Sequence, residues 1–386
     1  MSDVRNRIQA SKASLASDVV IGANSTVRAD EVVLGKAVHI AENVDITCDR
    51  LQLHDGCSIG PNTTILSPEV ELGPGCVLGG ALHAELNEYL RVGRCSIIAE
   101  RVRIVGQGLQ SGEFLWVESD VLIGGGGARG PRSYLTVGDR TSIFARCYVN
   151  LSEQVRLGSS TALSYGVVVL THGAWQPALM GYATRFAPVS VGSHVVVYVN
   201  SVVMPGVSIG DYATVGAGSV VTHDVPAHCL AVGSPARVIK GPGDYPRPLD
   251  EVQKDALIRG VLADYATTLP SKGVQIVDNA LASRQSLVVQ FDGRETAIVY
   301  IPLGAELALY VQADITMALG PLPSKAKSQC HLDLANETLT GEPTALAEDL
   351  RDYLRRHIMR VFTGQPFRSL PLANLHRLSL RRKGQS

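Results

Sequence analysis

The sequence predicts a parallel β-helix followed by a separate α+β domain, and three observations support this prediction. Aliphatic residues recur at every sixth position along residues 188–221, as expected of a chain that turns a corner after each short strand and points one side chain per corner into a narrow prism. The composition combines 38 glycines with only 5% aromatic residues, which suits a thin aliphatic prism better than an aromatic-rich core. The period of six does not return after Lys240, so the remaining chain belongs to another fold.

Length and charge restrict the classes of protein to consider. The chain has 386 residues, a net charge of −1 and 45% hydrophobic residues, so we expect two or three globular domains rather than a disordered chain or a nucleic-acid binder. No apolar run approaches the ~18–20 residues that span a membrane, and residues 1–17 lack the apolar stretch of a secretory signal. We therefore expect no membrane span and a cytoplasmic protein.

The seven cysteines show no CxxC spacing, which argues against a disulfide framework and against a structural zinc site. Cys57 and Cys76 lie at the same phase of the repeat, 19 residues apart. We expect buried free thiols.

After an N-terminal lead at 1–14, the β-helix is predicted over 15–241. Aliphatic residues there follow steps of six, six and seven, which gives a coil of 19 residues with one enlarged corner. The predicted inward positions are Leu15, Ile21, Val27, Leu34, Ile40, Ile46, Leu53, Ile59, Ile65, Leu72 and Leu78. Counting on to Val221 gives roughly ten coils.

The register is lost in four segments, which we predict to be loops: 79–90, 106–115, 124–134 and 172–187. The third contains four consecutive glycines but lacks the spacing of a phosphate-binding loop, so it is interpreted as a corner loop. The fourth is long and leaves a rigid scaffold, which is where functional residues gather.

Beyond the β-helix we predict a linker and helix over 242–270 and an α+β accessory domain over 271–386. Asp250 is a candidate N-cap for the helix. The residues predicted on its inward side are Val252, Ala256, Leu257, Val261 and Leu262. Asp292-Gly293 is typical of a hairpin turn, and 343–362 has the pattern of an amphipathic helix.

The closing coils also resemble a known family. The runs Pro188–Gly192, Met204–Gly210, Val215–Val221, Asp224–Pro226 and Gly233–Lys240 are similar to the end of the left-handed β-helix (hexapeptide-repeat) acyltransferases, in their acetyltransferase branch. The resemblance implies a left-handed helix and an acyltransferase that uses acetyl-CoA or another acyl-CoA. It also implies a sugar or sugar-like acceptor with a hydroxyl or amine, and a homotrimer with sites between neighbouring prisms.

The same resemblance assigns roles to residues of the acceptor site. His172, where a coil ends and the longest loop begins, corresponds to the general base; neutral imidazole can take the acceptor proton near neutral pH. Asn150 corresponds to a residue that contacts the acceptor, and Trp175, Tyr182 and Arg185 would line its pocket. The alternatives are a loop histidine bonded to backbone, an asparagine capping a corner, and a loop packed on its own aromatic residues.

For the donor, the resemblance implies that Ala217, Gly218 and Ser219 line the pantetheine arm, because an amide-bearing chain must approach the backbone closely. Arg237 and Lys240 would contact its phosphates. Both could equally be solvated charges on a strand edge.

The sequence departs from the family pattern in several places. Val196-Val197-Tyr198 replaces Trp-Ile-Gly, His223 replaces a lysine, and Gly-Ser-Pro-Ala replaces Gly-Asn-Pro-Ala. These departures motivate an alternative hypothesis, a non-catalytic β-helix scaffold or assembly protein. No metal is expected, because His172 has no HxxxxH companion of the kind that a zinc-binding branch of the fold uses.

Overall fold

The computed structural model describes residues 7–173, 176–302, 312–319, 327–363 and 369–370. These fall into two compact units, Met1–Pro248 and Leu249–Ser386, which we describe separately. Trp175 lies outside the described residues. Within the described residues, every helix is too short or too polar to cross a bilayer.

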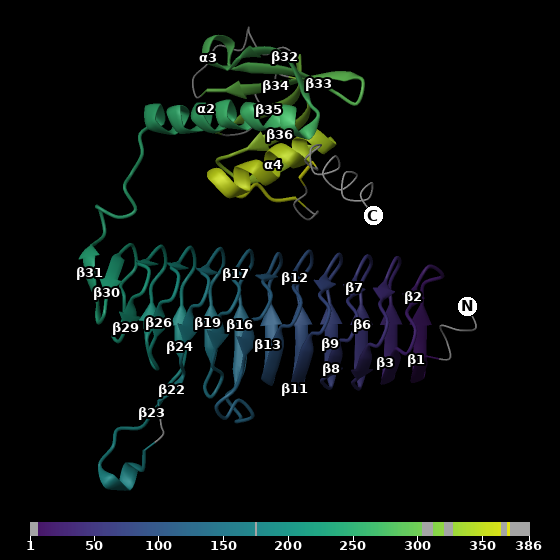
Figure 1. Cartoon of the computed structure of the whole chain (residues 1–386), viewed down its shortest axis with the longest axis vertical. Helices are drawn as coiled ribbons and strands as arrows, with labels where there is room; N and C mark the ends of the chain where they lie inside the picture. The colour runs from purple at the N-terminus through teal and green to yellow at the C-terminus, as the bar shows by residue number, and fades with distance from the viewer. Residues whose placement is uncertain (1–6, 174–175, 303–311, 320–326, 364–368, 371–386) are drawn as a thin grey trace, which may run out of the picture. The chain divides into compact units, whose positions relative to one another are not determined.

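The first unit is a prism of stacked short strands (Figure 1). One face is a twelve-stranded sheet whose first eleven strands run parallel, so the described chain makes eleven coils, close to the predicted ten. Its strands are β2 (Val20–Ile21), β4 (His39–Ile40), β7 (Ser58–Ile59), β10 (Val77–Leu78), β12 (Ile97–Ile98), β14 (Trp116–Val117), β17 (Ser142–Ile143), β20 (Ala162–Leu163), β25 (Val196–Val197), β28 (Thr214–Val215), β30 (Leu230–Gly233) and the antiparallel β31 (Ala236–Lys240).

A seventeen-stranded sheet forms the rest of the prism wall. Its strands are β1 (Ile8–Leu15), β3 (Thr26–Leu34), β5 (Asp45–Thr47), β6 (Arg50–Leu53), β8 (Thr64–Leu66), β9 (Glu69–Leu72), β11 (His83–Val92), β13 (Arg103–Ser111), β15 (Leu122–Ile123), β16 (Tyr134–Val137), β18 (Tyr148–Val149), β19 (Val155–Leu157), β21 (Val168–Val169), β24 (Val189–Val191), β26 (Val202–Val203), β27 (Ser208–Ile209) and β29 (Val220–Val221). The predicted fold class, a left-handed parallel β-helix with a C-terminal α+β domain, is confirmed in its architecture; the hand itself follows from the family resemblance.

The 19-residue coil is confirmed in the N-terminal half. Val20 pairs with His39, His39 with Ser58, and Ser58 with Val77, each 19 residues on. The predicted inward residues between Ile40 and Leu78 are at most 1% exposed. Asn24, Asn43 and Asn62 take the left-handed backbone conformation at equivalent corners, which asparagine tolerates better than most residues, and their amides form a ladder with bonds of 3.3 and 3.2 Å.

Two of the predicted loops are wrong. Residues 79–90 contain most of β11, which lies between β9 and β13 in the sheet wall, and residues 106–115 contain the second half of β13. The repeat is disguised in β11 because alanine occupies the inward position at Ala84 and the register shifts between Leu86 and Tyr89. In β13, Gly108 is small because a Cβ there would lie 2.7 Å from the Tyr89 ring.

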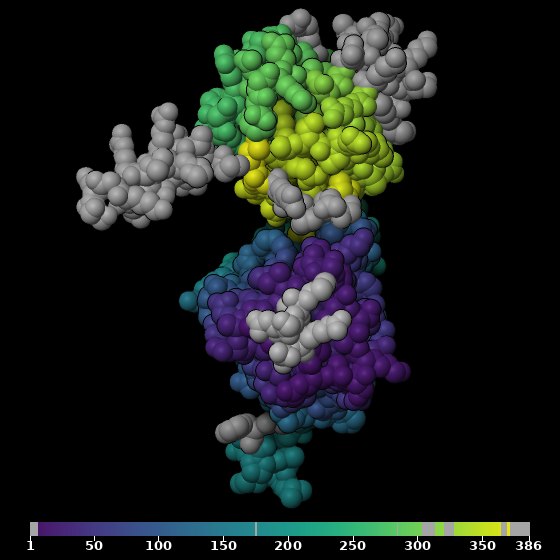
Figure 2. All heavy atoms as spheres, turned by 90° about the vertical axis from the view of Figure 1, so that its right-hand side faces the viewer, coloured from purple at the N-terminus to yellow at the C-terminus, as the bar shows by residue number. Residues whose placement is uncertain are grey.

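The other two breaks do interrupt the coils. Gly124 to Gly127 all have positive φ, and the chain regains the wall only at β16. Residues 172–187 form a projecting loop held at its base by β22 (His172–Gly173) and the antiparallel β23 (Arg185–Phe186), with a short 3₁₀ turn η1 (Ala178–Met180) at its tip. Figures 1 and 2 show this teal loop standing out from the side of the prism.

All seven cysteines are free and buried, as predicted from their spacing. Burial raises the pKa of the Cys147 thiol to about 11 and that of Cys48 to about 12, so both stay protonated and unreactive near neutral pH.

The second unit is a mixed six-stranded sheet with helices, which fits the predicted α+β domain. Its elements are α2 (Glu251–Thr268), η2 (Leu269–Lys272), β32 (Gln275–Ala280), α3 (Leu281–Arg284), β33 (Ser286–Phe291), β34 (Arg294–Ile301), β35 (Gln312–Ala318), β36 (Lys327–Asp333), β37 (Thr338–Gly341) and α4 (Ala345–His357). Asp250 caps α2 in a capping box with Gln253, and Asp292-Gly293 turns the hairpin between β33 and β34.

The inward face of α2 agrees only in part with the predicted one. Leu262 is buried as predicted, but Val252 and Leu257 are 78% and 50% exposed, and Ile258 and Tyr265 are buried instead. Helix periodicity alone did not separate the two faces because apolar residues occur on both sides of this helix.

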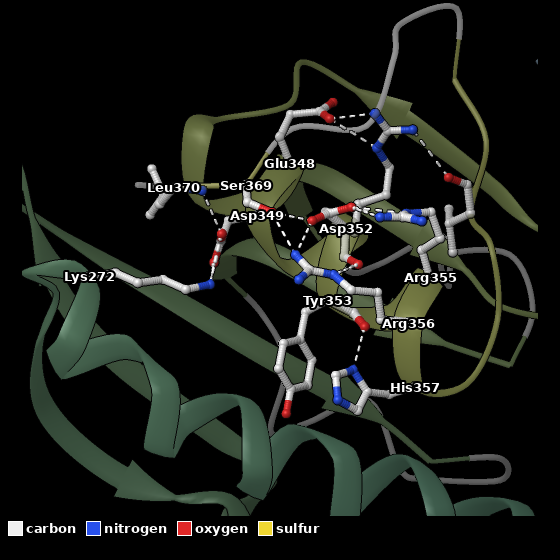
Figure 3. Close-up of polar contacts among 12 residues, drawn as sticks. Lys272, Glu348, Asp349, Asp352, Tyr353, Arg355, Arg356, His357, Ser369 and Leu370 are labelled. Atoms are coloured by element: carbon white, nitrogen blue, oxygen red, sulfur yellow. Dashed lines mark hydrogen bonds and ion pairs between the residues drawn. The ribbon is translucent and has the colours of Figure 1, made fainter. Parts of the chain in front are cut away.

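Helix α4 carries a dense polar network (Figure 3). The carboxylate of Asp349 is fully buried and accepts hydrogen bonds from Lys272 Nζ at 2.7 and 2.8 Å, from the Tyr265 hydroxyl at 3.0 Å and from the Leu370 amide at 2.6 Å. The partners come from α2, η2 and residue 370, so we interpret the cluster as a structural one that joins these segments to α4.

Candidate active site

Three chain segments meet where the regular coils break. They are the glycine run at 124–127, the end of the β18 coil at 150–152, and the end of the β21 coil at 171–172. Because β15, β18 and β21 are neighbours in the sheet, the residues that follow them necessarily lie close together. His172 is the central side chain of this cluster.

The hydrogen bonds of His172 define its tautomer. Its Nδ1 lies 2.9 Å from Asn150 Oδ1 and 3.0 Å from Ser152 Oγ. The Asn150 amide donates from Nδ2 to Gly125 O at 2.8 Å, which orients Oδ1 as an acceptor toward the histidine. Nδ1 therefore carries the proton, and Nε2 keeps its lone pair. The Phe186 ring stacks on the imidazole at 5.5 Å between centroids. In this arrangement Nε2 has the lone pair that a proton acceptor needs.

Asn150 is placed differently from its predicted acceptor contact. Its side chain is fully buried, and Oδ1 also accepts from Thr171 Oγ1 at 2.6 Å. With its polar atoms bonded to protein groups, Asn150 orients His172 instead of facing solvent.

Sequence reasoning missed two members of this cluster. A Cβ at Gly126 would lie 2.3 Å from His172 Cε1 and 2.9 Å from Asn150 Nδ2, so only glycine fits there, at φ +59°. Ser152 Oγ bridges Gly126 O and His172 Nδ1. The four-glycine run was the available signal for Gly126; Ser152 had none.

The predicted acceptor residues of the projecting loop are not all brought to the histidine. Tyr182 is 47% exposed beyond the 3₁₀ turn. Arg185 lies at the loop base, where its guanidinium occupies the space beside Gly206 and lines a cavity of about 310 Å³.

The predicted donor residues occupy the last coils. Ala217 and Gly218 are exposed at the corner before β29, whereas Ser219 is buried and its Oγ accepts from the Gly233 amide at 3.0 Å. Arg237 and Lys240 are exposed on β31. The corner at Gly218 precedes β29 and His172 follows β21, so they lie at opposite ends of the strand column β21–β26–β29.

Within the residues that the structure describes, no group of three or more histidine, cysteine, aspartate or glutamate side chains is placed to hold a metal ion.

Comparisons with known proteins agree with this architecture. Residues 188–223 match the family model "Bacterial transferase hexapeptide (six repeats)". The Bacillus subtilis (strain 168) protein YvoF, named as an acetyltransferase, is 31% identical over 107 residues, 27% of this chain and 59% of that protein. The 2,3,4,5-tetrahydropyridine-2,6-dicarboxylate N-acetyltransferase of Enterococcus faecalis (strain ATCC 700802 / V583) is 42% identical over 69 residues, 18% of this chain and 30% of that enzyme.

Among solved structures, a maltose O-acetyltransferase from Clostridium difficile 630 is similar at 29% identity with a TM-score of 0.29, covering 33% of this chain and 66% of that one. The chain therefore spans less than two thirds of the length of each of these relatives. The matched region includes the closing coils in which the resemblance was first seen. The resemblance to the hexapeptide-repeat acyltransferases is thus confirmed, and the prism carries the bacterial transferase hexapeptide repeat.

Proposed function

We propose that the chain is an acyl-CoA-dependent acyltransferase, which most simply moves an acetyl group to a hydroxyl or amine of a sugar or sugar-like acceptor. The observation that carries the proposal is the geometry of His172. Its Nδ1 is held by Asn150 and Ser152, so that Nε2 is left as a proton acceptor at the edge of the longest loop.

An acyl thioester supplies an electrophilic carbonyl carbon. As the acceptor oxygen or nitrogen bonds to that carbon, His172 Nε2 takes the acceptor proton, and the imidazolium is stabilised by its bond to Asn150 Oδ1. The carbon–sulfur bond then breaks, and His172 returns the proton to the leaving sulfur. General-base catalysis of this kind contributes about 10²–10⁴-fold.

The last coils suit coenzyme A. At Gly218 a Cβ would meet nothing within 4 Å, so the backbone at this corner is open to a ligand. Arg237 and Lys240 are exposed nearby in the chain and would hold the phosphates, while Ala217 to Ser219 would line the arm. A ligand extended along the face would run from this corner toward His172. We also propose a homotrimer that works in the cytoplasm.

The test is release of coenzyme A thiol from acetyl-CoA across a panel of sugar acceptors. His172→Ala should lower kcat/KM by at least about 10²-fold without weakening acetyl-CoA binding, because Nε2 acts only on the reacting proton. His194→Ala is the matched control, since His194 is exposed on a later coil and stacks on Tyr212. Full activity of the His172→Ala protein would refute the assignment.

Titration with coenzyme A separates the enzyme from the scaffold alternative. Saturable binding that is weakened by the double change Arg237→Ala/Lys240→Ala supports the transferase. No binding at millimolar coenzyme A would favour the scaffold.

A further inference from the structure

Several arginines of the prism are paired with carboxylates and others are not. Arg28, Arg91, Arg94, Arg101 and Arg132 each pair with a carboxylate within 4 Å. Arg156 and Arg185 form no ion pair with any residue in the part of the chain that the structure describes, yet they line one cavity. A cavity lined by two cationic side chains and by no carboxylate favours an anion.

The cavity has hydrogen-bond donors in its lining beside the two arginines. Its volume is about 310 Å³, and no acidic residue is among those that line it. Arg156 on β19, Ser190 on β24 and Ser208 on β27 are register partners, so they form a row across three neighbouring strands. Gln154 is also among the lining residues. Guanidinium, hydroxyl and amide groups are the donors that a carboxylate or phosphate accepts from.

Gly206 makes room for one of the arginines. A Cβ at this position would lie 2.4 Å from Arg185 Nη2 and 3.1 Å from Arg185 Cζ. The guanidinium therefore rests against bare backbone at the wall of the cavity. A larger residue at 206 would displace it.

One short strand, β23, lies between the cavity and the proposed base. Along β23, Phe186 stacks on the His172 ring, and the preceding residue is Arg185. Successive side chains of a strand point to opposite sides, so the ring face and the guanidinium lie on the two sides of the same ribbon. The Ala187 amide then donates to Thr171 O at 3.0 Å, which fixes the ribbon to the coil that ends in His172.

We propose that this cavity, defined by Arg156 and Arg185, binds an oxyanion of the acceptor, a carboxylate or a phosphate, and thereby selects anionic acceptors. The inference rests on the proposed function, in which His172 takes the proton of the acceptor. The bound anion anchors the acceptor at the loop base, and its nucleophile reaches past the ribbon to Nε2. A neutral acceptor lacks this anchor.

The experiment measures binding of three sugars of matched ring size to the full-length protein by saturation-transfer difference NMR: glucose, glucuronate and glucose 6-phosphate. We expect the two anions to bind at least about tenfold more tightly than glucose, because charge-assisted bidentate bonds are among the strongest polar contacts. Arg156→Gln and Arg185→Gln should each remove most of that difference. A preference for only one of the two anions identifies the group as carboxylate or phosphate.

Arg103→Gln is the matched control. Arg103 is also an exposed prism arginine without an ion pair among the described residues, but it lies on β13, away from the cavity. It should leave the anion preference unchanged. The proposal is overturned if anion binding is absent, if it equals that of glucose, or if both cavity variants bind the anions as tightly as the unchanged protein does. Binding to surface charge in general would fall equally in the Arg103→Gln protein, which also overturns it.

The outcome is separable from that of the proposed function. Arginine-dependent anion binding without coenzyme A release from any tested acyl-CoA would leave the anion site standing and refute the transferase. Acyl transfer that depends on His172 but shows no preference for anionic acceptors would support the transferase and refute the anion site.

Discussion

The coils before Leu78 and those after Leu122 have the same architecture but differ in regularity. In the first group each coil is 19 residues long, one asparagine amide stacks on the next at the corner, and arginines such as Arg28 meet carboxylates. In the second group the coil length varies, glycines with positive φ replace the corner at 124–127, and a loop leaves the wall at His172.

The difference separates two uses of one fold. A regular coil satisfies its backbone groups through its two neighbours, and its side chains repeat one pattern from coil to coil. Where the repeat is broken, the polar side chains of Asn150, Ser152 and His172 lie in contact with one another. None of the three occupies a position that the aliphatic repeat defines. The irregular coils are therefore where chemistry is expected.

The largest expected effect is a loss of activity when a glycine of the irregular coils gains a methyl group, compared with the same change in the regular coils. Gly126→Ala places a Cβ 2.3 Å from the His172 ring and should lower kcat/KM by at least about 10²-fold by displacing the base. Gly56→Ala in the regular coils also has positive φ, but its Cβ would find its nearest neighbour at 3.8 Å. It should cost about 1 kcal/mol of stability and leave kcat unchanged. Equal activity losses in the two proteins would contradict the comparison.

A smaller effect is expected from removing a side-chain amide. Asn150→Ala removes the amide that donates to Gly125 O and the oxygen that accepts from the Thr171 hydroxyl and from His172, so we expect a loss of about 1–3 kcal/mol in the free energy of unfolding. Activity should fall by about 10-fold or more, as when an orienting partner is lost. The control is Asn43→Ala in the exposed ladder, for which denaturant melts should show at most about 1 kcal/mol. Unchanged activity of Asn150→Ala would argue against its orienting role.

The smallest effect concerns a surface ion pair of the regular coils. Arg91 donates to both carboxylate oxygens of Glu69, which lowers the pKa of that carboxyl below its ordinary 4.5. A lowered folded-state pKa gives stability that is present above the unfolded value and lost as the pH falls through the folded one. Arg91→Met should therefore reduce the loss of unfolding free energy on acidification below about pH 5. The reduction should be less than about 1 kcal/mol, because the pair is partly exposed. Thermal melts from pH 3 to 7 test this, with Arg103→Met as the control.

The repeat made the fold predictable. One aliphatic residue per corner is a strong constraint, and Ile40, Ile59 and Leu78 are buried where the period placed them. The same rule failed at β11 because it looked for large aliphatic residues and an unbroken count. Ala84 is inward but small, and the bulge after Leu86 adds residues that the count could not absorb.

The site was predictable only in part. His172 was a candidate because the family resemblance marks the end of a coil, and its role stays a prediction. Asn150 was also a candidate, but burial cannot be read from one residue, so its contact with His172 was not foreseen. Gly126 and Ser152 act through contacts between residues 20 to 46 positions apart, which only the stacking of coils brings together.

The constant length of the N-terminal coils has an evolutionary consequence. Because Val20, His39, Ser58 and Val77 are successive partners, recombination between any two of these coils would delete or duplicate whole turns and rejoin the wall in phase. Each turn contacts only its neighbours, so the prism can change length without disturbing His172. The number of N-terminal coils can thus vary while the coils that carry His172, the proposed base, stay under separate selection.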